Sequence, residues 1–150
     1  MSPRGNTGVG GTIRSLQICP GYRKPMEVFD QLDAVKNFGL KKDKHALPDS
    51  SRQILLLEKE TLDVLGLRPG QVKENITTIG IELMKLRSRQ RLKIGDSVVL
   101  EVTKACSPCS RMEDIRPGLL KELAGRRGIL ARVINGGILK RGDIIQLLPE

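Results

Sequence analysis

Aromatic residues are scarce in this sequence, which has no tryptophan, one tyrosine and two phenylalanines among its 150 residues. Proteins that bind single-stranded nucleic acid commonly stack the bases on exposed aromatic rings. Because the only rings are those of Tyr22, Phe29 and Phe38, such stacking is not expected, and nucleic acid is a disfavoured partner.

Long apolar runs are absent as well. No stretch approaches the roughly 20 apolar residues of a membrane-spanning helix, and the first residues lack the apolar segment of a secretory signal. We therefore expect no membrane association and a cytoplasmic location. The three cysteines are an odd number, and in a reducing compartment they are expected to remain thiols.

The remaining composition is that of a globular protein, since 39% of the residues are apolar and 16 are glycine. Several glycines lie near the start, so residues 1–10 are predicted to form a flexible N-terminal lead. Residues 11–150 are predicted to form a single domain, because a chain of this length can bury one sizeable core.

Basic residues outnumber acidic ones by 26 to 17, which gives a formal net charge of +9. The excess lies in residues 85–141, which hold 14 basic and 5 acidic side chains. Within residues 85–93 a cation stands at every second position, and on an extended strand these side chains would share one face. We interpret them as the charged face of an edge strand. A strip that binds phosphate or nucleic acid is the alternative.

The hydrophobic pattern indicates short strands and few helices. Segments rich in alternating or β-branched residues predict strands, and short segments with helical apolar spacing predict helices. The predicted strands are 12–18, 26–36 with an ambiguous second half, 53–57, and 72–86 broken at Gly80, and the predicted helices are 58–67 and 117–124.

A repeated segment organises the second half of the chain. Residues 92–100 and 139–147 share Leu, Lys, Gly, Asp and a final Leu in register, and each resembles a Gly-Asp turn that opens into a strand. Between them, residues 129–135 lead into Gly136 and Gly137, a pattern typical of a hairpin. These features predict a mainly β fold, a barrel or sandwich of short strands with about two small helices outside it.

The strongest chemical feature is the segment in which Cys106 and Cys109 are separated by Ser-Pro. A thiolate is both a nucleophile and a soft metal ligand. The neighbouring cations Lys104 and Arg111 would favour the thiolate form.

Three interpretations of these cysteines compete. A zinc site is not expected, because only Cys19 and His45 remain to complete four ligands and neither is paired in the sequence. A redox dithiol resembles the motif but needs alternating strands and helices that the pattern does not predict. The third interpretation is a single active thiol, with Cys109 favoured and Cys106 as its neighbour or as a small buried apolar residue.

Two polar clusters are further candidates for ligand binding. Asp43 and His45 lie in a polar connector, and Glu74 with Asn75 follows a Pro-Gly turn. Such residues often satisfy nearby backbone groups, and a single histidine in a loop is often an ordinary surface residue. They could equally orient a polar ligand.

Adjacent guanidinium groups occur at Arg126 and Arg127, directly before Gly128. Guanidinium groups on a flexible backbone suit an oxyanion. The alternative is an exposed helix end, where cations interact favourably with the last carbonyl groups.

An ordered set of short motifs runs through the chain. Its members are Gly39-Leu40, Asp43, His45, Arg52 before three leucines, Pro69-Gly70, Glu74-Asn75-Ile76, Gly80, Ile94-Gly95-Asp96, Pro108-Cys109, Gly128 and Gly142-Asp143. Together they resemble the MOSC domain, a module named for the C-terminal part of molybdenum-cofactor sulfurases. The resemblance runs from about Gly11 to Leu148. One departure is Lys42, which stands where the family usually has glycine.

The resemblance implies a closed or partly open β-barrel whose cysteine carries sulfur or ligates the molybdenum of a pterin cofactor. Cys109 matches the family cysteine, as catalytic thiol and metal ligand, and Cys106 is an additional thiol. Cations of residues 85–93 would help to hold the cofactor phosphate. The other residues expected to bind the cofactor are Asp43, His45, Arg52, Glu74, Asn75, Lys104, Arg111 and Arg127.

The resemblance is compatible with a sulfurtransferase or with an activity that depends on the molybdenum cofactor, in a stand-alone module. The implied partners are a sulfur donor, such as a cysteine desulfurase, or a molybdoenzyme. Pyridoxal phosphate is not expected, because no lysine motif marks a site for it. Two other functions stay open: a binding module for an anionic partner, nucleic acid or an acidic protein, through residues 85–141, and a redox enzyme that cycles Cys106 and Cys109.

Overall fold

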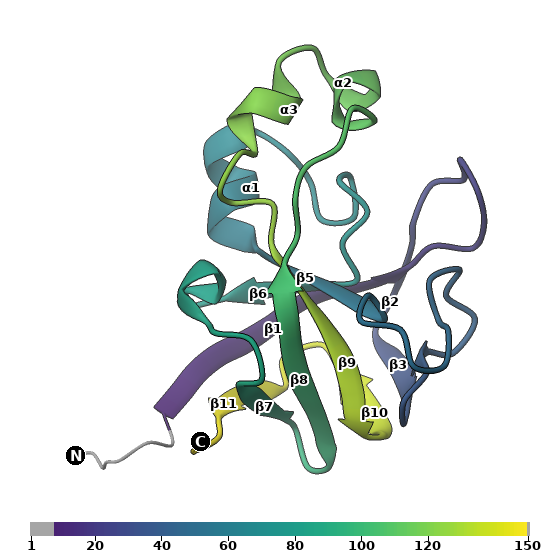
Figure 1. The fold of residues 1–150 in the computed structure, drawn as a ribbon, viewed down its shortest axis with the longest axis vertical. Coiled ribbons are helices and arrows are strands. Elements are labelled where there is room, and N and C mark those ends of the chain that lie inside the picture. Colours follow the sequence, from purple (N-terminus) through teal and green to yellow (C-terminus); the bar gives the residue numbers. More distant parts are fainter. Residues whose placement is uncertain (1–7, 150) are drawn as a thin grey trace.

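Strand β1 (Gly8–Ile18) closes a barrel, because it pairs with β6 (Ile76–Ile79) on one edge and with β11 (Ile144–Leu147) on the other. The structure, a computed structural model, describes residues 8–149. Around the barrel the order is β11-β7-β8-β9-β5-β6-β1 (Figure 1). The remaining barrel strands are β5 (Ile54–Glu58), β7 (Arg91–Ile94), β8 (Val98–Ala105) and β9 (Ile129–Asn135).

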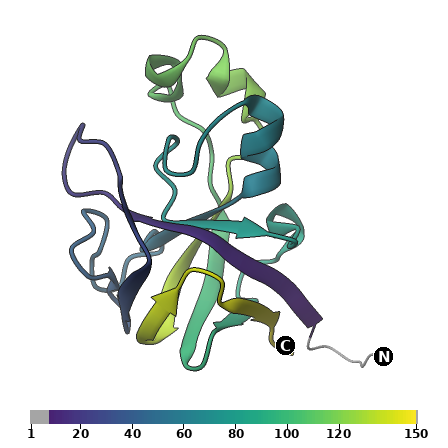
Figure 2. The same cartoon turned by 180° about the vertical axis from the view of Figure 1, so that it is seen from behind.

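Four short strands lie outside the barrel. Strand β2 (Glu27–Phe29) pairs with the C-terminal end of β1. A separate three-stranded sheet has the order β10-β3-β4, and Figure 2 shows it beside the barrel with the loops that follow it. Its strands are β3 (Gln31–Val35), β4 (Gly39–Leu40) and β10 (Gly137–Lys140).

Apolar side chains that alternate along the strands fill the barrel. In β8, Val98, Leu100 and Val102 are buried and the residues between them are half-buried, as the two-residue period of a strand requires. Strand β5 is instead buried continuously over residues 54–57, because it has a core on both faces. Leu56 packs in the barrel, whereas Leu57 belongs to a second apolar cluster beneath the helices.

Three short helices gather at one end of the barrel (Figure 1). They are α1 (Lys59–Leu65), α2 (Met112–Ile115) and α3 (Leu119–Glu122). Their buried contributions to the second cluster are Leu62 and Leu65 of α1, Met112 of α2 and Leu119 of α3. Across residues 8–149, no helix has the length and apolar character that crossing a bilayer requires.

This architecture confirms the predicted mainly β barrel with small peripheral helices. Helix α1 occupies most of predicted helix 58–67 and ends at Gly66, which has a left-handed φ of +70°. Helix α3 is shorter than predicted, because Gly118, with φ +88°, directly precedes it. Helix α2 was not predicted. Of the predicted N-terminal lead, residues 1–7 lie outside the described residues, and β1 begins at Gly8.

The alternating cations of residues 85–93 do not share one face of a strand, contrary to the prediction. Lys85 ends the 3-10 helix η1 (Leu83–Lys85), Arg89 has a left-handed φ of +76°, and β7 begins only at Arg91. The strand expected over residues 72–86 is likewise limited to β6. The reason is that Leu83 is buried in the barrel core, so the chain turns inward after β6.

The predicted hairpin at Gly136 and Gly137 is also wrong, because β10 pairs with β3 rather than with β9. A Cβ at Gly136 would lie 2.7 Å from the carbonyl oxygen of Ala34, so glycine allows the chain to pass close to β3 as it changes sheets. The two repeated segments do meet. Strand β7 pairs with β11, and the Gly95 N–H donates to the Ile144 carbonyl oxygen over 3.0 Å.

We predict that Gly128→Ala destabilises the protein more than Gly125→Ala does. Both glycines have left-handed φ, +106° at Gly128 and +76° at Gly125, so alanine is strained at either position by about 1–2 kcal/mol. Only at Gly128 would the new Cβ overlap backbone, the carbonyl oxygen of Leu56, which should add about 1–3 kcal/mol. Urea unfolding of the two variants measures the difference, and equal losses would contradict the prediction.

Candidate functional site

A cavity of about 550 Å³ lies between the loop that follows β1, the connector around His45 and helix α2. We call it the larger cavity. Six cationic side chains line it, with a single carboxylate, that of Asp114. The cations are Arg23, Lys24, Lys44, Lys73, Arg111 and Arg127, and the lining also includes His45, Cys19 and Cys109.

The positive charge of this cavity is not neutralised by neighbouring carboxylates. Within residues 8–149, none of the six cations forms an ion pair. Some basic residues outside the cavity do form ion pairs: Arg91 and Arg132 both bind Glu101, at 3.1 and 2.8 Å. Unpaired cations around a concave surface attract anions, so the larger cavity is suited to an anionic ligand.

Arg127 is the most deeply buried of the six cations. Arg127 is only 6% exposed. Its Nη2 donates to the Val72 carbonyl oxygen over 2.6 Å, whereas its Nη1 has no hydrogen-bond partner in the described structure. A buried charge with an unused donor is unfavourable unless an acceptor completes its hydrogen bonds. An anion in the cavity would provide that acceptor.

Cys109 lies in the excursion of residues 106–128 that connects β8 to β9. Hydrogen bonds hold both ends of its loop: the Cys106 N–H donates to the Gly128 carbonyl oxygen, and the Met112 N–H donates to the Cys109 carbonyl oxygen, each over 2.9 Å. Cys109 is exposed and lines the larger cavity, whereas the half-buried Cys106 lines a different, smaller cavity. The two thiols therefore line different cavities.

Asp43 and Asn75 are buried beneath the cavity and hold its walls in place. Asp43 Oδ1 accepts the Cys19 N–H at 2.7 Å and the Asn75 Nδ2 group at 3.2 Å, and Asp43 Oδ2 accepts the His45 N–H at 3.1 Å. Asn75 Oδ1 accepts the Leu55 N–H of β5 at 3.0 Å. Through these contacts Asp43 positions two cavity residues, Cys19 and His45.

Glu74 is a buried carboxyl group next to this network. Its Oε2 accepts the Gly70 N–H at 2.9 Å and the Thr77 hydroxyl at 3.0 Å, whereas its Oε1 has no partner in the described structure. Burial raises the pKa of Glu74, although these hydrogen bonds and the charge of Arg127 act against the shift. Glu74 thus shapes the turn at Gly70 and is not part of the cavity lining.

Tyr22 brings cations from three segments together. The guanidinium carbon of Arg23 lies 5.2 Å from the centre of its ring, and Lys44 Nζ and the Arg111 guanidinium carbon each lie at 4.7 Å. A hydrogen bond from Arg23 and the charges of Arg111 and Lys44 lower the pKa of Tyr22. The ring thereby links the Cys109 loop to the two loops on the opposite wall.

The structure brings together most, but not all, of the residues predicted from the sequence. Cys109, His45, Arg111 and Arg127 line the larger cavity. The smaller cavity adds Arg52 and Asn75, and it shares His45, Lys73 and Arg127 with the larger one. Lys104 is exposed near the end of β8 and lines neither cavity.

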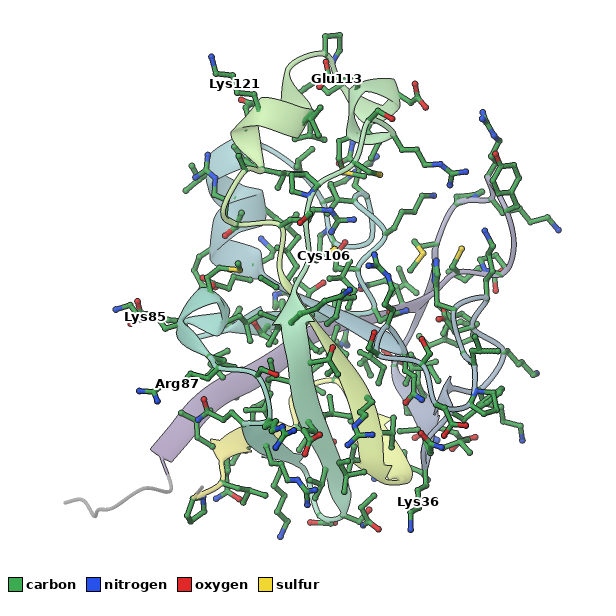
Figure 3. The ribbon with its side chains drawn as sticks, in the orientation of Figure 1. Lys36, Lys85, Arg87, Cys106, Glu113 and Lys121 are labelled. Carbon is green, nitrogen blue, oxygen red and sulfur yellow. The ribbon has the colours of Figure 1, made fainter. Side chains whose placement is uncertain are left out.

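The cations of residues 85–93 were expected to help hold a phosphate, but none of them lines either of these cavities. Figure 3 shows Lys85 and Arg87 pointing outward on the side away from the loops that form the larger cavity, with Cys106 between the two regions. These cations are remote from the cavities because the chain turns after β6. The segment that follows the turn, residues 85–93, then runs along the outer side of the barrel.

Among the residues of the larger cavity that sequence reasoning missed are one cysteine and four cations: Cys19, Arg23, Lys24, Lys44 and Lys73. The last two stand next to predicted residues, Lys44 between Asp43 and His45 and Lys73 directly before Glu74, so adjacency was an available signal. No comparable signal marked the loop that follows β1. Within the described residues, no group of three His, Cys, Asp or Glu side chains is arranged to hold a metal ion.

Comparison with known proteins supports a family assignment. Residues 38–146 match the profile of the MOSC domain. No curated protein is significantly similar to the chain.

Several solved structures share the fold. The YuaD protein of Bacillus subtilis superposes with a TM-score of 0.79 at 18% identity, over 95% of this chain and 97% of that chain. The YiiM protein of Escherichia coli has a TM-score of 0.69 at 16% identity, over 95% of this chain and 70% of that chain. The YiiM protein of Geobacillus stearothermophilus has a TM-score of 0.62 at 16% identity, over 96% of this chain and 76% of that chain. At these identities the likeness supports the fold alone.

We predict that Glu74→Gln changes the pH dependence of stability. Because burial raises the pKa of Glu74 above its ordinary value of 4.5, the protonated form stabilises the native state below that value, and this contribution is lost as the pH rises through the native pKa. Glutamine cannot ionise and retains a polar group of the same shape. The free energy of unfolding of wild type, measured with urea, should therefore fall relative to the variant as the pH rises above 4.5, and parallel curves would refute the prediction.

Proposed function

Because this chain belongs to the MOSC domain family, we propose that its larger cavity binds the pterin molybdenum cofactor and that Cys109 ligates the molybdenum or carries sulfur for it. The observation that carries the proposal is that one cavity is lined by the exposed thiol of Cys109 and by six cations without ion-pair partners among the described residues. One of these cations, Arg127, is buried and has a hydrogen-bond donor, Nη1, without a partner in the described structure.

The cavity residues fit the chemistry of this cofactor. A volume of about 550 Å³ lies within the range of small-molecule sites, roughly 300–1,000 Å³. Arginine and lysine side chains suit a phosphate group, and a cysteine thiolate suits molybdenum as a soft ligand.

Each group of cavity residues would have a distinct task. Arg127 and Lys73 would bind the phosphate, with Nη1 of Arg127 as the buried donor. Arg111, on the same loop as Cys109, would favour the thiolate. Asp43 would position Cys19 and His45 through their backbone N–H groups. When bound, the cofactor would provide a molybdenum centre for oxygen-atom or sulfur chemistry.

In the sulfur-carrier version, the Cys109 thiolate attacks the outer sulfur of a persulfide on a donor. A new S–S bond forms at Cys109, the S–S bond of the donor breaks, and the donor leaves as a thiolate. A cysteine desulfurase is a donor of this chemical class, and a molybdoenzyme is a suitable recipient. The exposure of Cys109 would permit the approach of either protein.

Two alternatives explain the structure less well. Binding of nucleic acid or an acidic protein through residues 85–141 would require one continuous basic surface. The cations of that segment are instead divided among the cavity, ion pairs with Glu101 and the outer side of the barrel. A redox dithiol would bring Cys106 and Cys109 together, whereas these residues line different cavities.

The test compares wild type, Cys109→Ser and the matched control Cys106→Ser, each expressed with molybdenum-cofactor biosynthesis intact. Bound molybdenum is measured by elemental mass spectrometry, and bound sulfur by intact protein mass without reductant. We expect wild type and Cys106→Ser to retain molybdenum or gain the mass of one sulfur atom, and Cys109→Ser to lose that signal at least tenfold. If wild type shows neither signal, or if Cys109→Ser retains it, the role of Cys109 is refuted.

A further inference from the structure

The six cations of the larger cavity lie at two depths. Arg127 is buried and Lys73 is half-buried, and these two would hold the phosphate of the cofactor. The other four cations are exposed, and three of them have no task in the proposed function. We call these four the cationic rim: Arg23, Lys24, Lys44 and Arg111.

Three of the rim cations are gathered around a single ring, that of Tyr22. The charged groups of Arg23, Lys44 and Arg111 all lie within 5.2 Å of its centre, so they repel one another. Each exposed cation–π contact offsets only about 0.5–1 kcal/mol, and within residues 8–149 none of the three forms an ion pair. A surface that concentrates unpaired charge of one sign gains most from a partner of the opposite sign.

The position of Tyr22 indicates a macromolecular partner. Its residue is 54% exposed, more than either phenylalanine of the chain, and it is not among the residues that line the larger cavity. A small ligand inside the cavity would therefore leave the ring in water. A protein surface could cover the ring and pair the cations around it at the same time. Tyrosine and arginine are enriched among the residues that dominate the affinity of protein interfaces.

An acidic protein fits the rim better than a nucleic acid does. A nucleic-acid strand is bound by cations that follow successive phosphates and by exposed rings that stack on bases. Here the cations converge on one point, and they already surround the only tyrosine. The rim also includes Arg111, two residues after Cys109. A protein that exchanges sulfur with Cys109 must bring its own reactive sulfur to this place.

We propose that Tyr22 and the cationic rim dock an acidic surface segment of the protein that exchanges sulfur with Cys109. Carboxylates of that segment pair with Arg23, Lys44 and Arg111, which brings the reactive sulfur of the partner over the larger cavity. This inference rests on the proposed function and adds the chemistry by which the partner is recognised. It differs from a basic surface over residues 85–141, because only Arg111 of the rim belongs to that segment.

The experiment uses two synthetic peptides as probes. Each carries a cysteine in a mixed disulfide with thionitrobenzoate, separated by two glycines from four glutamates in one peptide and from four glutamines in the other. The Cys109 thiolate attacks the sulfur of the peptide, a new disulfide forms between protein and peptide, and thionitrobenzoate leaves with the electron pair of the broken bond. Its absorbance gives the rate at low ionic strength, and peptide mass mapping gives the share of the product at Cys109. The protein is expressed without cofactor biosynthesis, so that the thiol is free.

The measured quantity is the rate of the acidic peptide at Cys109 divided by that of the neutral peptide. We expect a ratio of at least ten in wild type, and a ratio at least fourfold lower in Arg23→Gln/Lys44→Gln. The matched control is Arg87→Gln/Lys121→Gln, which removes the same charges from side chains that point away from the larger cavity (Figure 3) and line neither cavity. It should change the ratio less than twofold. A ratio near one in wild type, or equal losses in both variants, would overturn the proposal, since equal losses reflect net charge alone.

A second pair of variants tests the ring itself. Tyr22→Phe keeps an aromatic ring for the cations, whereas Tyr22→Leu keeps only an apolar side chain. If the ring positions the three cations, the rate ratio should fall at least threefold in Tyr22→Leu and less than twofold in Tyr22→Phe. Equal ratios in these two variants would show that the ring does not organise the rim, and would overturn the role of Tyr22.

A further arm separates the two classes of polyanion and the two proposals. Binding of a 20-nucleotide single strand is followed by fluorescence anisotropy in the same buffer. Binding that is lost in Arg23→Gln/Lys44→Gln, together with a rate ratio near one, would assign the rim to nucleic acid and overturn the docking of an acidic protein. If wild type neither retains molybdenum nor gains sulfur, the proposed function fails, but the rate ratio still decides whether the rim attracts an acidic segment. A ratio near one in a protein that retains molybdenum removes the docking surface alone.

Discussion

The buried side-chain amide of Asn75 ties together three segments on which the site depends. Its Nδ2 donates to the Gln17 carbonyl oxygen of β1 and to Asp43 Oδ1, both over 3.2 Å, and its Oδ1 accepts the Leu55 N–H of β5. These partners come from two barrel strands and a connector. Each buried polar group left unpaired would cost about 1–3 kcal/mol, so this one side chain fixes the connector to the barrel.

Two lysines next to buried carboxyl groups near the site adopt backbone conformations that carry a cost. Lys42 and Lys73 directly precede the buried carboxyl groups of Asp43 and Glu74, and both adopt left-handed backbone conformations, with φ of 71° and 72°. Such conformations in residues other than glycine are held only where the surroundings determine them, and they cluster at functional sites. Lys42 stands where the family usually has glycine, and its φ explains that preference.

Arg127 and Glu74 are both buried, and their surroundings bear on the positive charge of the cavity. Burial raises the pKa of Glu74, so its carboxyl group is biased toward the neutral form, and it opposes the charge of Arg127 less than an exposed carboxylate would. Arg127 is held by one backbone carbonyl group and keeps Nη1 free. The positive potential of the cavity therefore has a buried source, the Arg127 guanidinium group, which a backbone carbonyl group holds in place. The surface lysines add to this charge.

Local sequence patterns determined much of this protein. The two-residue alternation of strands such as β8 and the glycine that ends α1 were predictable, because strand faces and turns depend on neighbouring residues. The hairpin at Gly136 and the cationic face of residues 85–93 were not, since strand pairing and the burial of Leu83 depend on residues distant in the chain. Only the tertiary structure decided which cations surround the thiol. Closure of the barrel brings loops from both halves of the chain to one cavity, and potentials add in space rather than along the sequence.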